Sequence, residues 1–177
     1  MSIDTSINTL MTLLQRDTLT QIMIIITNIV STKVLTILSL LLILFLTYKK
    51  RYQKIFLVIL SIGGGIALEL SLKALIQRAR PENALIESST YSFPSGHATL
   101  AIIFFSLLIY LFKDQIKNKI SRYCFITLNI LLIILIGFSR VYLNVHWFTD
   151  VLAGFAIGLI CLLIIIKLFK RKLSTAI

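Results

Sequence analysis

Histidine, acidic residues and cysteine are all scarce in this sequence, which limits the chemistry that it can carry. The 177 residues include two histidines, seven acidic residues and two cysteines. Cys124 and Cys161 lie inside apolar runs, without the spacing of a redox or metal-binding motif, so we assign them no function. The few carboxylates form no cluster that would hold a pair of metal ions. We therefore expect no metal and no other cofactor.

The N-terminus also lacks the features of a removable signal peptide. Asp4, Arg16 and Asp17 are present there, and no basic region is followed by a small-residue cleavage site. We expect the first spanning helix to direct insertion into the membrane.

Apolar sequence, in contrast, is abundant. Hydrophobic residues make up 58% of the chain and charged residues 14%, with a mean hydropathy of +0.95. A soluble domain of this length would leave much of that surface in water, whereas a bilayer core about 30 Å thick takes up helices of about 20 apolar residues. We therefore predict a membrane protein made of one helical domain, residues 1–177.

The formal net charge of +11 raises the question of a nucleic-acid partner. Twelve of the eighteen basic residues gather in three clusters that flank apolar runs, which is the positive-inside pattern of membrane proteins. Nucleic-acid binding is therefore not expected, and the clusters are predicted to lie in the cytoplasm. The clusters are Lys49, Lys50, Arg51 and Lys54; Lys113, Lys117, Lys119 and Arg122; and Lys167, Lys170, Arg171 and Lys172.

Five apolar runs can cross a bilayer once their flanking residues, tilt or snorkelling are included. The predicted fold is an all-α, polytopic transmembrane helical bundle. With the basic clusters inside, residues 77–96 and 140–148 share the extracytoplasmic face. For residues 18–31 we favour an interfacial helix, with a short sixth span as the alternative. Gly154 and Gly158 indicate close helix packing. The five runs are 34–48, 55–76, 97–112, 123–139 and 149–166.

The first group of polar residues lies at the outer end of the second run, in the segment KALIQRARP. It holds three cations, and Pro81 is expected to end the helix there. A snorkelling collar of basic residues is the structural alternative, but positive charge on this face runs against the topology signal. Glu69 precedes Lys73 by one helical turn, which predicts an ion pair.

The second group is the segment FPSGHAT, which leads into the third apolar run. A helix that begins here presents free backbone N–H groups and its positive dipole end, and Ser95 adds a hydroxyl group, so the turn suits a phosphate. His97 would then stand beside that anion. The alternative is a serine N-cap with an incidental interfacial histidine.

The third group is SRVYLNVHWFTD, between the fourth and fifth runs. On a helix, the four-residue spacing of His146 and Asp150 places both on one face, so the carboxylate can accept a hydrogen bond from one imidazole nitrogen and leave the other free to attack. Arg140 adds a fixed cation. A satisfied polar contact at the membrane boundary is the alternative.

All three groups fall on one predicted face, which favours the functional interpretation over the separate structural alternatives. Both histidines of the chain, one carboxylate and several cations meet there, and this set suits a phosphoryl group. Its oxygens need positive charge and N–H donors, one imidazole can attack phosphorus, and another acid can protonate the leaving oxygen.

At this point the chain resembles a known family, the type 2 phosphatidic acid phosphatase superfamily. Its signature is Lys-x6-Arg-Pro, then Pro-Ser-Gly-His, then Ser-Arg-x5-His-x3-Asp. All three parts are present in the same order, within residues 69–154. They comprise Lys73 and Arg80-Pro81; Pro94-Ser95-Gly96-His97; and Ser139-Arg140 with His146 and Asp150.

The resemblance implies a helical bundle shared with vanadium haloperoxidases and glucose-6-phosphatase, and a phosphohistidine on His146. It further implies that Asp150 orients His146 and that His97 is the acid for the leaving group. Membrane members of the family usually have six spans, against the five predicted here. The phosphate-binding residues that it implies are Lys73, Arg80, Ser95, Gly96 and Arg140, with Glu69 in support.

We therefore predict a metal-independent, integral membrane enzyme that hydrolyses a lipid phosphate or diphosphate at the extracytoplasmic face of the cell membrane. Its partners would be that lipid and the surrounding membrane lipids. Undecaprenyl diphosphate, phosphatidylglycerophosphate, phosphatidic acid and a lipid A phosphate are all candidate substrates. The alternative from another class is a non-catalytic lipid-phosphate binder or transporter of the same fold, which would need neither a nucleophile nor an acid.

Overall fold

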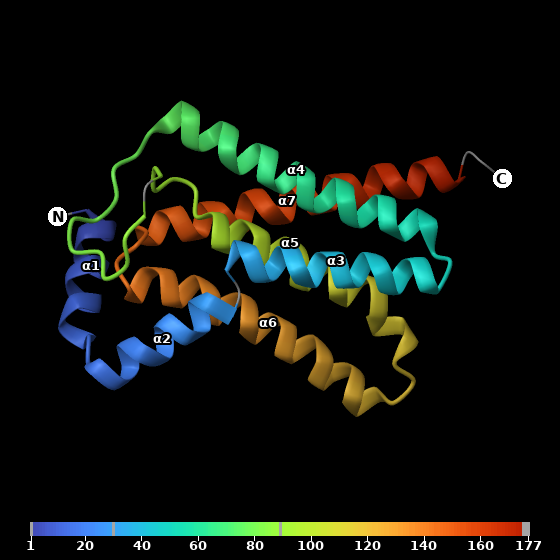
Figure 1. Ribbon diagram of the computed structural model, residues 1–177, viewed down its shortest axis with the longest axis horizontal. Coiled ribbons are helices and arrows are strands. Elements are labelled where there is room, and N and C mark those ends of the chain that lie inside the picture. The colour runs from blue at the N-terminus through green and yellow to red at the C-terminus, as the bar shows by residue number, and fades with distance from the viewer. Residues whose placement is uncertain (1, 30, 89, 175–177) are drawn as a thin grey trace.

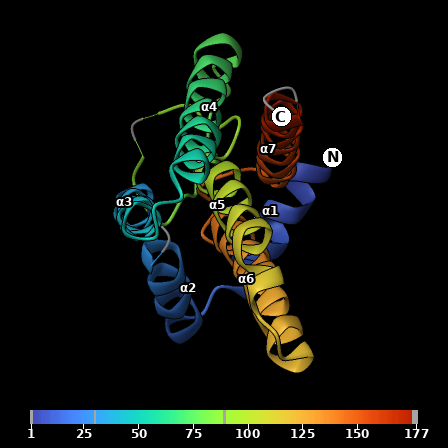
Figure 2. The same ribbon diagram turned by 90° about the vertical axis from the view of Figure 1, so that its right-hand side faces the viewer.

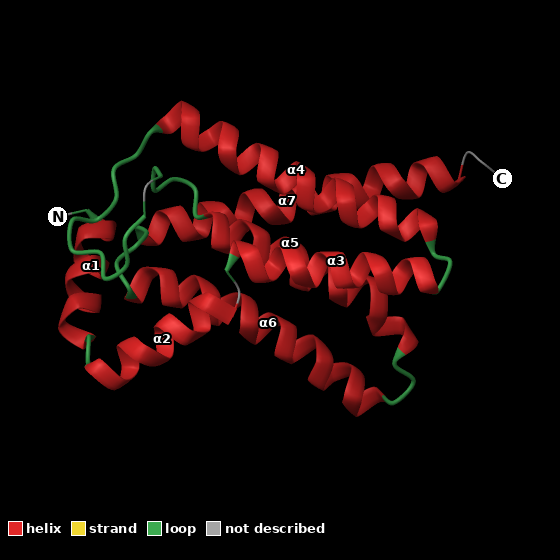
Figure 3. Cartoon of the chain, in the orientation of Figure 1, coloured by secondary structure: helices red, strands yellow, loops and turns green. Residues whose placement is uncertain are grey.

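The computed structural model describes residues 2–29, 31–88 and 90–174. All regular elements in these ranges are helices, and none is a strand (Figure 3). Val30 of the ambiguous run 18–31, Ser89 of the predicted outer loop and residues 175–177 of the third basic segment lie outside the described residues. The helices are α1 (Ile3–Leu14), α2 (Asp17–Ile29), α3 (Thr32–Tyr48), α4 (Tyr52–Ile76), α5 (Gly96–Phe112), a 3₁₀ turn η1 (Lys113–Gln115), α6 (Lys119–Tyr142) and α7 (Phe148–Ser174).

Five helical segments within the described ranges are long and apolar enough to cross a membrane, which confirms the five predicted spans. The first of them, Asp17–Tyr48, combines α2 with α3, and the two helices meet at an angle (Figure 1). The helix that lies across the end of the bundle is instead α1 (Figure 1). The sequence analysis favoured an interfacial helix at residues 18–31, with a short sixth span as the alternative. It did not predict the separate helix α1 or a candidate span that runs from Asp17 to Tyr48.

Helix α5 forms the centre of the bundle, surrounded by α3, α4, α6 and α7 (Figure 2). It is the most buried of the five candidate spans, because apolar side chains cover nearly its whole circumference. Two glycines bring α7 close to it, as predicted. A Cβ atom added at Gly154 would lie 2.7 Å from the Ser95 carbonyl oxygen, and one added at Gly158 would lie 2.6 Å from that of Thr99. This contact sets the N-terminal ends of α5 and α7 side by side.

Helix α4 ends earlier than Pro81, which corrects the expectation that this proline stops it. The helix ends at Ile76, and Gln77 takes a left-handed conformation with φ of 48°. Its backbone N–H donates to the Lys73 carbonyl oxygen at 3.1 Å, the usual way to satisfy a final helical carbonyl. Pro81 therefore lies within the following loop rather than at the helix end.

The loops that the sequence analysis placed on one face do meet at one end of the bundle. The Leu85 backbone N–H donates to the Leu143 carbonyl oxygen at 3.0 Å, and the Trp147 indole donates to the Ala79 carbonyl oxygen at 2.9 Å. The α3–α4 connection, the α5–α6 connection and the C-terminal end of α7 lie at the opposite end (Figure 1). The three basic segments are thus separated from the two loops by the length of the bundle.

Candidate active site

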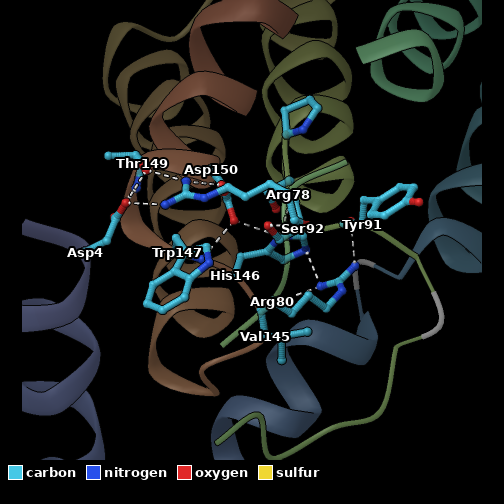
Figure 4. A network of polar contacts seen from close by, with 12 residues as sticks. Asp4, Arg78, Arg80, Tyr91, Ser92, Val145, His146, Trp147, Thr149 and Asp150 are labelled. Atoms are coloured by element: carbon cyan, nitrogen blue, oxygen red, sulfur yellow. Dashed lines mark hydrogen bonds and ion pairs between the residues drawn. The ribbon is translucent and has the colours of Figure 1, made fainter. Parts of the chain in front are cut away.

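Of the predicted site residues, Arg80, His146 and Asp150 come together where the loop after α4, the segment before α5 and the start of α7 converge (Figure 4). Backbone hydrogen bonds hold the three segments together. Ser95 N–H donates to the Asp150 carbonyl oxygen at 3.0 Å, and Ser92 N–H donates to the Arg78 carbonyl oxygen at 2.8 Å. The site is therefore built on two adjacent helix ends and one loop tied to them.

His146 lies in the turn that precedes α7 and is 3% exposed. Its Nδ1 lies 2.7 Å from the Ser92 carbonyl oxygen, and its Nε2 lies 3.2 Å from Arg80 Nη1. A carbonyl oxygen only accepts and a guanidinium only donates, so both contacts require the same neutral tautomer, with the proton on Nδ1. The lone pair on Nε2 then faces the cations.

The environment also keeps this imidazole neutral. Burial lowers the pKa of His146 to about 4, against the opposing effect of Asp150, and the charges of Arg80, Arg140 and Lys73 lower the pKa further. At neutral pH the ring is unprotonated at Nε2, which is the form that can act as a nucleophile.

Asp150 holds a different position from the one predicted. His146 precedes the helix, so the argument from one helical face does not apply to the pair. The Asp150 Oδ2 lies 3.7 Å from His146 Nδ1, which is too long for a hydrogen bond. Asp150 instead accepts from the Trp147 backbone N–H at 2.9 Å and from Arg78 Nη1 at 2.6 Å. The carboxylate is near the imidazole but is oriented by other groups.

Lys73 forms the predicted pair with Glu69, with 3.4 Å between Nζ and Oε1. The same ammonium group donates to the carbonyl oxygens of Tyr91 at 2.8 Å and Pro94 at 2.9 Å. Glu69 also lies against the start of α5, because a Cβ atom added at Gly96 would come within 2.7 Å of its Oε1. A side chain at position 96 would therefore displace the Glu69 carboxylate.

Arg80 is fixed by the loop backbone and by the turn before α7. Its Nε donates to the Thr90 carbonyl oxygen at 2.7 Å and its Nη1 to the Val145 carbonyl oxygen at 2.6 Å. Burial lowers the pKa of Arg80, and the charges of Asp150 and Glu69 oppose that effect. A guanidinium starts so far above neutrality that it stays charged.

Two buried polar atoms of the predicted phosphate-binding set have no hydrogen-bond partner in the described part of the chain. They are Ser95 Oγ and Arg140 Nε, although Arg140 Nη1 donates to Thr27 Oγ1 at 2.7 Å. Buried donors of this kind normally have a partner. His97, in the first turn of α5, makes no hydrogen bond to described residues but interacts electrostatically with Arg140 and His146.

A hollow of about 650 Å³ opens between the end of α4 and the loop that follows it, and its lining includes Lys73, Arg78 and Arg80. A second hollow of about 1160 Å³ shares Arg80 and Ser88 with it. The described residues bring no three histidine, cysteine, aspartate or glutamate side chains into a metal-binding group.

A family model described as the PAP2 superfamily matches residues 54–174. The chain belongs to the PAP2 superfamily. Phosphatidylglycerophosphatase B of Bacillus subtilis is 35% identical over 130 residues, which cover 72% of this chain and 63% of that protein. The match therefore spans less than two thirds of that relative.

Two solved structures resemble this PAP2 protein over most of its length. The transmembrane PAP2 type phosphatidylglycerolphosphate phosphatase from Bacillus subtilis gives a TM-score of 0.86 at 29% identity, covering 96% of this chain and 85% of that chain. LpxE from Aquifex aeolicus gives a TM-score of 0.75 at 26% identity, covering 94% and 96% of the two chains. The all-helical transmembrane fold and the family resemblance are thereby confirmed.

Sequence reasoning missed three residues that organise this PAP2 site. Arg78 binds Asp150, Ser92 supplies the carbonyl that holds His146, and Asp4 binds Arg78 at 2.7 Å. Arg78 lies between the two basic residues of the first motif, so its type and position were visible in the sequence. A backbone carbonyl carries no sequence signal, and Asp4 is 74 residues away from its partner.

Proposed function

We propose that this PAP2 protein is a membrane lipid phosphatase that forms a phosphohistidine on His146. The observation that carries the proposal is the fixed tautomer of this buried, neutral imidazole, with Nδ1–H bound to Ser92 and Nε2 facing Arg80. A neutral nitrogen lone pair beside several fixed cations is suited to attack on a phosphoryl group.

The phosphate would be held by positive charge and by N–H and O–H donors. Arg80 and Lys73 border the hollow, while the unpartnered Ser95 Oγ and Arg140 Nε are buried donors that phosphate oxygens would satisfy. Gly96 begins α5, whose N-terminal N–H groups favour an anion. On binding, Arg80 Nη1 would transfer its hydrogen bond from His146 Nε2 to a phosphate oxygen.

The reaction then takes two steps. His146 Nε2 forms a bond to phosphorus while the bond from phosphorus to the lipid oxygen breaks, and His97 gives its proton to that oxygen. Water next attacks the phosphohistidine, His97 takes a proton from the water, and the phosphorus–nitrogen bond breaks to release inorganic phosphate. Asp150 stabilises the positive charge that the first step places on the His146 ring.

We propose a phosphomonoester lipid of the phosphatidylglycerophosphate class as the substrate. The support comes from the Bacillus subtilis relatives, whose names give this activity to them. We further propose that the site faces the extracytoplasmic side of the cell membrane, because the basic clusters lie at the other end of the bundle.

A phosphate-release panel with purified protein in detergent tests both parts. Phosphatidylglycerophosphate, phosphatidic acid, undecaprenyl diphosphate and a lipid A phosphate are compared at equal concentration, and phosphatidylglycerophosphate is expected to react fastest. His146→Ala is expected to abolish release from every lipid. A folded His146→Ala protein with wild-type turnover would refute the phosphohistidine, whereas a different best lipid would refute only the substrate.

A further inference from the structure

The N-terminal helix α1 reaches the reaction centre through one buried side chain. Asp4, in its first turn, is 7% exposed. Its Oδ1 accepts from the Thr149 backbone N–H at 3.0 Å, and its Oδ2 accepts from the Thr149 hydroxyl at 2.6 Å and from Arg78 Nη2 at 2.7 Å (Figure 4). The family model matches residues 54–174, so Asp4 lies outside the matched segment.

Arg78 joins Asp4 to the candidate catalytic carboxylate. While Nη2 binds Asp4, Nη1 donates to Asp150 Oδ1 at 2.6 Å and to the Thr149 hydroxyl at 2.8 Å. Its guanidinium also lies 5.4 Å from the centroid of the Trp147 ring. A planar guanidinium with two nitrogens on two carboxylates has little freedom to turn, so Asp4 holds Arg78 in the orientation that Asp150 needs.

Asp4 carries a negative charge in this arrangement. Burial raises the pKa of Asp4, but the hydrogen bonds from Thr149 and Arg78 outweigh burial and the net pKa is lowered. Asp150 is fully buried and forms its close ion pair with Arg78, while His146 lies farther away. The negative charge of Asp4 partly offsets the positive charge of Arg78. The Asp150 carboxylate can therefore still attract positive charge on the imidazole 3.7 Å away.

From this geometry we infer that Asp4 is a positioning residue, which acts through Arg78 on Asp150 and thereby on phosphoryl transfer to His146. The inference rests on the proposed function of His146. It gives α1 a part in the rate of the reaction in addition to its packing. The alternative is a purely structural role, in which Asp4 only ties α1 to the start of α7. The experiment must distinguish this role from an effect on the reaction.

Asp4→Asn is the informative variant, because the amide oxygen can still accept the Thr149 N–H while the negative charge is removed. Asn8→Ala is the matched control, since Asn8 lies on the same helix and donates its hydrogen bond to Asn83, at 3.2 Å, rather than to Arg78 or Thr149. With phosphatidylglycerophosphate in detergent micelles, Asp4→Asn is expected to lower kcat by about 10- to 100-fold, as a misplaced catalytic group does. KM for both variants, and kcat for Asn8→Ala, should stay within about twofold of wild type.

A double variant shows whether Asp4 acts through Asp150. In the Asp150→Asn background, Asp4→Asn is expected to cause little further loss of kcat, because residues that act as a unit are not additive. Losses that multiply would overturn the inference, as would a folded Asp4→Asn protein with the kcat of wild type. If Asp4→Asn does not fold, Arg78→Lys tests the same link, since an ammonium group cannot bridge both carboxylates in the same way. Its kcat should fall similarly, and an unchanged kcat would overturn the inference.

His146→Ala separates this inference from the proposed function. If that variant keeps its turnover, the phosphohistidine itself is wrong. If it is inactive while Asp4→Asn matches wild type in kcat, only the role of Asp4 fails.

Discussion

His146→Gln should make the protein more resistant to mild acid than wild type. The pKa of His146 is lowered from 6.5 to about 4 in the folded protein, first by burial. Between these two pH values the unfolded chain binds a proton that the folded chain does not. The free energy of unfolding therefore falls as the pH drops below 6.5, and this contribution levels off below a pH of about 4. Above pH 6.5 the residue adds no pH dependence.

The size of the effect follows from the width of that window. At about pH 5 the unfolded state is almost fully protonated at this position and the folded state is not, which corresponds to about 2 kcal/mol. For a chain of this length, each kcal/mol shifts the unfolding midpoint by about 2–4 °C, so wild type should lose about 4–8 °C more than His146→Gln between neutral pH and about pH 5.

Thermal unfolding of both proteins in the same detergent, in phosphate-free buffer at the two pH values, measures this difference. Phosphate is left out because an anion that binds only the folded state would stabilise it. The quantity compared is the shift of the unfolding midpoint between the two pH values within each protein. The free-energy cost of burying glutamine is the same at both pH values and therefore cancels. Equal losses in the two proteins would show that His146 titrates normally in the folded state, and the account of its neutral, locked ring would be refuted.

Three further predictions concern the mechanism and the topology. His97→Ala should reduce hydrolysis of phosphatidic acid more than that of p-nitrophenyl phosphate, because general acid catalysis, worth about 10²–10⁴-fold, matters most for a poor leaving group; equal losses would leave His97 as a phosphate-binding residue. Turnover should survive EDTA and be inhibited by vanadate, which takes a trigonal bipyramidal geometry beside His146, whereas loss with EDTA and recovery with magnesium would contradict the histidine mechanism. A reporter that is active only in the cytoplasm should be silent when fused after Glu87 and active after Lys117, and the reverse pattern would overturn the orientation.

Much of the architecture was predictable because it depends on local sequence. Long apolar runs require helices in a bilayer, where each backbone polar group must be satisfied within its own segment. The pairing of Glu69 with Lys73 follows from helical spacing alone, and the structure contains it. The boundary at residues 14–17 was not predictable in this way, since α1 is a short amphipathic helix whose position depends on what it packs against.

Within the candidate site, the sequence by itself determined which residue types were available and on which face they would gather. Motif spacing and charge bias carry that information, because both are read along a contiguous stretch. Tertiary structure alone decided the partners of His146 and Asp150. The close approach of Gly154 to Ser95 sets α7 beside α5, which brings the Ser92 carbonyl to His146 and turns Asp150 toward Arg78. Contacts between backbone carbonyls and distant helices depend on how whole helices pack, and local composition does not encode that packing.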